Sequence, residues 1–91
     1  MARFEMGEIS AMAEAQPNAD SLFELGMIYS TGRDIGADLV AAHKWFNLAA
    51  MRGNPEAVYH RQQVAEEMGP VAISEALRAA REWLQTHAPR G

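Results

Sequence analysis

Apolar residues recur at helical spacing in five segments of this 91-residue chain. The clearest stripes surround Trp45 and Trp83, where an apolar residue returns every three or four positions. No segment shows the sustained alternation of Val, Ile and Thr that is typical of a β-strand. We therefore predict an all-α fold of about five helices. The five segments span residues 3–15, 20–31, 38–52, 55–68 and 70–87.

The helical pattern repeats along the chain. Residues 18–21 read Asn-Ala-Asp-Ser, and residues 54–57 read Asn-Pro-Glu-Ala, 36 positions later (54 − 18). A period in the thirties is typical of stacked helical hairpins. We therefore expect one domain, residues 1–91, folded as a short α-α superhelix of antiparallel helical hairpins. Its parts are a leading half-unit at 3–15, a well-formed repeat at 20–53 and a degenerate closing repeat at 55–87.

The well-formed repeat carries a specific set of residues. A Leu25-Gly26 pair is followed by Tyr29 and Gly32, and the second helix contains the run Ala42-x-x-Trp-Phe-x-x-Ala-Ala. This pattern resembles the Sel-one-like repeat, a relative of the tetratricopeptide repeat. The resemblance implies adaptor or scaffold roles in protein complexes and no conserved catalytic residues. The closing repeat lacks the Leu-Gly pair and the Tyr, as terminal repeats often do.

Composition narrows the class of function. The formal net charge is −4, so wholesale binding to nucleic acid or to an anionic membrane is not expected, because both need clustered Lys and Arg. The chain has no cysteine, which excludes disulfides, thiolate catalysis and cysteine-ligated metals. We find no signal-peptide pattern at the start and no apolar run of about 20 residues. We expect a cytoplasmic protein.

Residue spacing offers little for catalysis. The three histidines, at positions 43, 60 and 87, have no metal-ligand spacing and are expected to be solvent-facing or partly buried. The adjacent Glu66 and Glu67 would point about 100° apart on a helix, so they cannot easily share a proton. No Gly-x-Ser-x-Gly elbow or phosphate-binding glycine loop occurs. We therefore predict no catalytic, cofactor-binding or metal residue and no enzymatic activity.

One candidate protein-binding groove emerges from the repeat. The first helices of successive hairpins line the concave face of such a stack. The 36-residue offset pairs Phe23 with Tyr59 and Met27 with Gln63, and each helix supplies its two residues one turn apart. An aromatic and Met surface suits a peptide or a partner helix. The alternative is that Phe23 and Met27 only widen the core.

These observations favour a non-enzymatic adaptor module that binds another protein or peptide. A small regulatory subunit or small-ligand binder that modulates an enzyme is the alternative, and a pocket with converging polar groups would favour it. Because the chain is short for a repeat stack, its open ends could also be covered by a second copy in a homodimer.

Three local expectations accompany this fold. Trp45 and Trp83 should pack in the core between neighbouring hairpins. Gly26 should permit another backbone to come close. Asp20 or Ser21 should cap the helix of the well-formed repeat.

Overall fold

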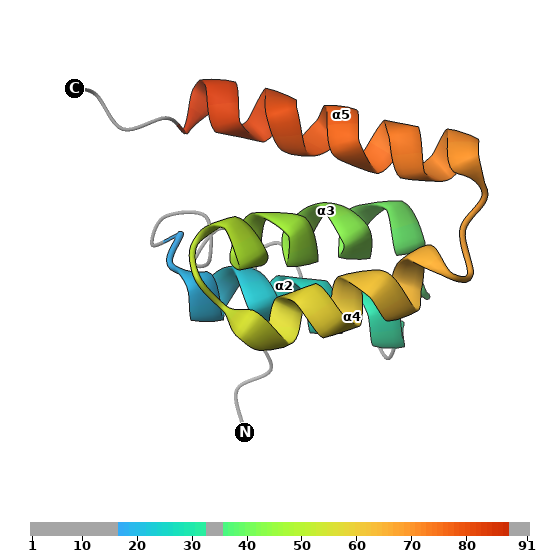
Figure 1. Ribbon diagram of the computed structural model, residues 1–91, viewed down its shortest axis with the longest axis horizontal. Coiled ribbons are helices and arrows are strands. Elements are labelled where there is room, and N and C mark those ends of the chain that lie inside the picture. The colour runs from blue at the N-terminus through green and yellow to red at the C-terminus, as the bar shows by residue number, and fades with distance from the viewer. Residues whose placement is uncertain (1–16, 33–35, 88–91) are drawn as a thin grey trace.

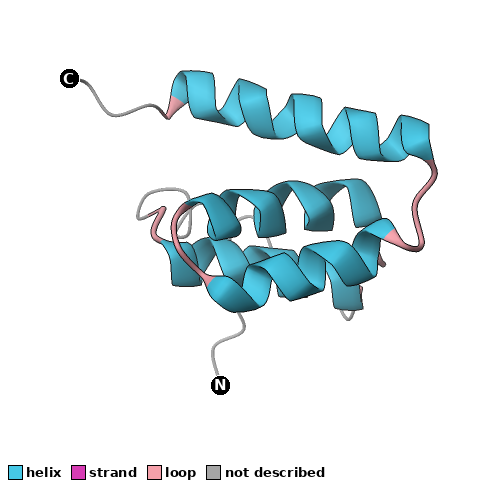
Figure 2. Ribbon diagram, in the orientation of Figure 1, coloured by secondary structure: helices cyan, strands magenta, loops and turns pink. Residues whose placement is uncertain are grey.

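The computed structural model describes residues 17–32 and 36–87 (Figure 1). Within those residues the chain forms four helices and no strand, as Figure 2 shows, which confirms the all-α prediction. The predicted helix at 3–15 lies outside the described residues, so the helices number four where five were expected. No helix in the described ranges has the length and hydropathy needed to cross a membrane. The helices are α2 (Ala19–Thr31), α3 (Leu39–Met51), α4 (Pro55–Ala65) and α5 (Pro70–Thr86).

Asparagine side chains start the two equivalent helices. The Oδ1 atom of Asn18 accepts a hydrogen bond from the backbone N–H of Ser21 at 2.8 Å, and Asn54 Oδ1 accepts one from Ala57 at 3.1 Å. The prediction that Asp20 or Ser21 caps α2 was therefore wrong, because the helix begins one residue earlier than expected and Ser21 is the donor. The 36-residue echo in the sequence marks two helix caps of the same kind.

Helix α3 lies at the centre of the domain. Helices α2, α4 and α5 each pack mainly against α3. Figure 1 shows α5 along one side of α3, with α2 and α4 along the other. Helices α4 and α5 run in opposite directions, as the hairpin prediction requires, but each buries its apolar side against α3 more than against the other. The first helices of the two units, α2 and α4, are thereby left next to one another on one face.

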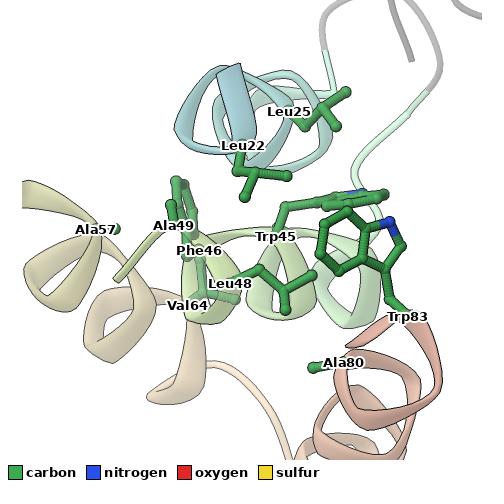
Figure 3. Packing of buried hydrophobic residues seen from close by; sticks show 11 residues of the cluster. Leu22, Leu25, Trp45, Phe46, Leu48, Ala49, Ala57, Val64, Ala80 and Trp83 are labelled. Carbon is green, nitrogen blue, oxygen red and sulfur yellow. The ribbon is translucent and has the colours of Figure 1, made fainter. Parts of the chain in front are cut away.

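The core is built around large side chains of α2, α3 and α5. Phe46, Leu22, Leu25 and Leu48 are the largest fully buried side chains among the described residues. Figure 3 shows Leu22 of α2 pointing toward α3, and Leu25 belongs to the same buried cluster. Burying each such side chain contributes about 1.5–3 kcal/mol.

Trp83 of α5 reaches Trp45 of α3. Their ring centroids lie 6.0 Å apart at an interplanar angle of 81°, in an edge-to-face arrangement. Both rings are buried, which confirms the predicted core packing of the two tryptophans.

Gly26 makes room for an aromatic ring. A Cβ atom at this position would overlap the side chain of Phe46. The expectation of close approach is met, but the neighbour is a side chain and not a backbone. The glycine of the Leu-Gly pair therefore lets α2 pack directly against the Phe46 ring of α3.

Candidate functional site

The four predicted groove residues lie on the two helices that were expected to carry them. On α2, Phe23 and Met27 are half-buried and pack against the edge of the core. On α4, Tyr59 is 62% exposed and Gln63 is also exposed. Phe23 and Met27 thus also do what the alternative interpretation expected, because they widen the core on the side facing α4.

A buried ring supports this face from beneath. Phe46 of α3 is fully buried, and its centroid lies 5.6 Å from that of Phe23. It also stacks on His60 of α4, with centroids 5.4 Å apart and planes at 27°. Since Phe46 touches side chains of both α2 and α4, it fixes the position of each helix relative to the other.

His60 joins the aromatic side chains of the two helices. Its ring meets Phe23 edge-on at 5.2 Å and meets Tyr59 edge-on at 5.5 Å. We call Phe23, His60 and Tyr59, together with Met27 beside them, the aromatic strip. The strip is continuous across α2 and α4, so a partner could contact it as one surface.

The 36-residue repeat does not predict the position of His60 between the two helices. The 36-residue offset pairs Phe23 with Tyr59, but the ring that Phe23 touches belongs to the next residue, His60. The signal was present in the spacing, because Glu56, His60 and Gln63 recur at four and three positions on one side of α4. Equivalent helices in a stack can differ in register. A shift of one residue along α4 brings His60, in place of Tyr59, against Phe23.

Polar contacts hold the starts of α2 and α4 near one another. The Nδ2 group of Asn54 donates to Oδ1 of Asp20 at 3.5 Å. Arg52, which follows α3, donates from Nη1 to the backbone oxygen of Pro17 at 2.6 Å. These contacts bring together segments more than 30 positions apart in the sequence, and they fix one end of the aromatic strip.

The second aromatic group of the molecule is closed. Trp45 and Trp83 are each 5% exposed. Lys44 lies 4.2 Å from the Trp45 ring centroid, and the ring of His87 stacks on Trp83 at 4.2 Å with planes at 8°. Arg52 also lies 5.6 Å from the Trp83 ring centroid, so two cations and an imidazole lie against this pair. Of these two groups in the described part of the chain, only the strip on α2 and α4 presents an exposed ring, that of Tyr59.

A histidine of α3, the helix that carries Phe46, is buried. His43 of α3 is 5% exposed, so the expectation of a solvent-facing or partly buried imidazole was wrong for this residue. Its Nδ1 atom has no hydrogen-bond partner. Nearby, Arg61 of α4 donates from Nη1 to Oδ1 of Asn47 at 2.7 Å. Burial, and then the charge of Arg61, lower the pKa of His43 below its ordinary 6.5, so the ring is neutral at physiological pH.

This imidazole has no access to a substrate, and no group of three His, Asp or Glu residues that could hold a metal occurs among the described residues. The described face of α2 and α4 presents aromatic rings that pack on one another.

Comparison with known protein families gives one result for this chain. The family model for the Sel1 repeat matches residues 19–54, which span α2, α3 and the Asn54 cap of α4. Searches of curated proteins and of solved structures gave no match. The matched unit is the one that carries the Leu-Gly pair, the buried Trp45 and the supporting Phe46. Residues 19–54 of this chain therefore match one Sel1 repeat, a helical-repeat unit.

Proposed function

We propose that this protein is a non-enzymatic adaptor or scaffold module that binds a segment of another protein at the aromatic strip. Sel1 repeats are generally protein-interaction modules. The observation that carries the proposal is the exposure of Tyr59, 62%, beside two rings that rest on the buried Phe46. Tyrosine is enriched among the residues that dominate binding energy at protein interfaces.

The strip is suited to binding because its members are already held in place. Rings that pack against neighbours lose little conformational freedom when a partner arrives, so less of the interaction energy is spent on ordering them. Met27 adds a flexible apolar side chain at the edge, which can adapt to the partner's shape. We place this adaptor in the cytoplasm, in keeping with its cysteine-free sequence.

The small-ligand alternative has weaker support. A hollow of about 190 Å³ occurs on α5, but side chains of that single helix line it. Ligand pockets are usually about 300–1,000 Å³ and are lined mainly by apolar groups from several elements. The residues that line the hollow are Val71, Ser74, Glu75, Arg78 and Arg81.

A homodimer is a second proposal, supported by different residues. Among the residues that the structure describes, four large apolar side chains are exposed outside the strip, on α3, α4 and α5. A second copy packed on them would bury surface that a neighbouring repeat covers in a longer stack. Sedimentation velocity would test this, and a monomer mass across the accessible concentration range would contradict it. These residues are Met51, Val58, Val71 and Leu77.

The adaptor proposal can be tested by site-directed photocrosslinking. A benzoylphenylalanine at position 59 should crosslink to a defined partner in native extract, whereas the same group at position 85, an exposed position of α5 outside the proposed dimer contact, should not. The partner's affinity should then fall about tenfold or more in Tyr59→Ser, the loss of about 1.4 kcal/mol or more that marks an interface anchor.

Val58→Ser is the matched control, because Val58 is a 45% exposed neighbour on the same helix and lies outside the strip. Equal affinities for the two variants would contradict the proposed site.

A further inference from the structure

The outward sides of α2 and α4 carry acidic side chains around the aromatic strip. On α2, Asp20 and Glu24 are exposed, and they stand four positions apart, so they share one side of the helix. On α4 and the turn after it, Glu56 and Glu67 are exposed at either end of the side that carries His60. An apolar centre is thus flanked by negative charge on both helices.

Few basic side chains stand near this charge in the described residues. Arg52, at the end of the strip, directs its guanidinium to the backbone oxygen of Pro17 and lies 5.6 Å from the ring centroid of Trp83 on α5. Helix α2 contains no Lys or Arg. Helix α4 contains one, Arg61, and its guanidinium is directed to Asn47 of α3. The exposed Arg78 and Arg81 belong to α5, which packs along the other side of α3. The charge on this face is therefore of one sign, while the apolar residues at its centre call for a partner with apolar side chains.

We propose that the segment bound at the aromatic strip is a cationic amphipathic helix of a partner protein. This inference rests on the proposed function and names the chemistry of the partner. Phe23 and Met27 stand one helical turn apart, about 6 Å along the axis, which matches apolar side chains at i and i+4 of a bound helix. Lys or Arg residues along the flanks of that helix would meet Asp20, Glu24, Glu56 and Glu67.

Charge complementarity favours a cationic partner helix over an acidic one. A single exposed ion pair is worth little, but several of one sign speed association and disfavour a partner of like charge. An acidic helix with the same apolar stripe would be repelled. Because the carboxylates are exposed, salt should weaken the preference within the range of the Debye length.

Two synthetic peptides test the proposal. Both form an 18-residue helix with the same leucine stripe, and their polar positions carry Lys in one and Glu in the other. Fluorescence anisotropy at low salt should show the Lys peptide binding at least about tenfold more tightly. The difference should shrink when salt is raised to about 1 M, where the Debye length falls to about 3 Å.

Two double variants separate local charge from total charge. Glu24→Gln with Glu67→Gln removes two charges from the face, and Glu75→Gln with Glu82→Gln removes two from the exposed side of α5. The first pair should weaken the Lys peptide about three- to tenfold at low salt, and the second less than about twofold. Circular dichroism checks that both variants keep the fold.

The outcomes distinguish this inference from the proposed function. Equal binding of the two peptides, with both weakened by Tyr59→Ser, would overturn the cationic partner and leave the binding site in place. Equal weakening by the two double variants would also overturn the inference, because total charge would then explain the preference. If neither peptide binds while position 59 still crosslinks to a native partner, the inference fails alone. If position 59 gives no crosslink either, both fail.

Discussion

Replacing Trp83 by alanine should detach α5 from the rest of the domain. Helix α5 packs mainly on α3, and its buried residues along that contact are Ala76, Ala80 and Trp83. The two alanines are small, so the tryptophan is the largest buried side chain of α5, with Leu84 partly buried against the same cluster. Its ring also contacts Trp45 and stacks on His87.

The expected magnitude follows from the burial of that ring. Trp83 is 5% exposed, and truncation of a buried tryptophan to alanine costs about 3–5 kcal/mol. Of this, the edge-to-face pair with Trp45 accounts for about 0.5–1.5 kcal/mol beyond its area. Small domains have a total stability of about 5–15 kcal/mol, so the variant should lose a large share of it. Helix α5 has 17 residues, and its melting should lower the far-ultraviolet dichroism visibly.

The assay is urea unfolding followed by circular dichroism and by tryptophan emission. The sequence holds two tryptophans, so the variant leaves Trp45 as the only fluorophore. Trp45 is buried under Trp83, and its emission should shift to the red once α5 detaches. Val71→Ala is the control on the same helix, because Val71 is 75% exposed and should change stability by no more than about 0.5 kcal/mol. A variant that unfolds at the same urea concentration as this control, with blue Trp45 emission, would refute the reasoning.

Three further predictions concern the core and the caps. Because burial lowers the pKa of His43 in the folded state, the unfolded chain takes up a proton first as pH falls below about 6.5, and the protein loses stability there by at most about 1.4 kcal/mol per pH unit. His43→Leu should flatten this slope in thermal melts between about pH 5 and 6.5, and an unchanged slope would assign it to other groups. Asn54→Ala should cost about 1 kcal/mol in urea unfolding, because the N–H of Ala57 loses its acceptor, whereas Asn54→Ser should keep most of the stability. Gly26→Val should cost about 1–3 kcal/mol because its side chain overlaps the Phe46 ring, and Phe46→Leu in the same chain should recover part of that loss; additive effects would show that the two positions do not interact.

The four described helices could be predicted from sequence because each apolar stripe has only one periodicity that fits it. Trp45 and Trp83 were placed in the core for that reason, and both are buried. The start of α2 was misplaced because Asn18, Asp20 and Ser21 are all good capping residues, and propensity alone does not choose among them.

Properties that depend on the relative position of helices were harder to predict. His43 lies beside the stripe of α3 by spacing, yet it is buried because α4 covers that side as well. The contact of Phe23 with His60 depends on how far α4 slides along α2, and no local pattern specifies that distance. The candidate strip could thus be assigned to the correct helices, while the residue that joins them could not be identified.

Two adjacent residues of α3, Trp45 and Phe46, pack against different helices. Successive residues of a helix point about 100° apart, so Trp45 can face α5 while Phe46 faces α2 and α4. In this Trp-Phe pair, Trp45 therefore packs against α5, the second helix of the closing unit. Phe46 positions the aromatic strip. It follows that stability and binding should respond to different substitutions. Trp83→Ala should weaken the domain and leave the contacts of Phe46 with Phe23 and His60 intact, whereas Gly26→Val should displace the strip at a smaller cost in stability.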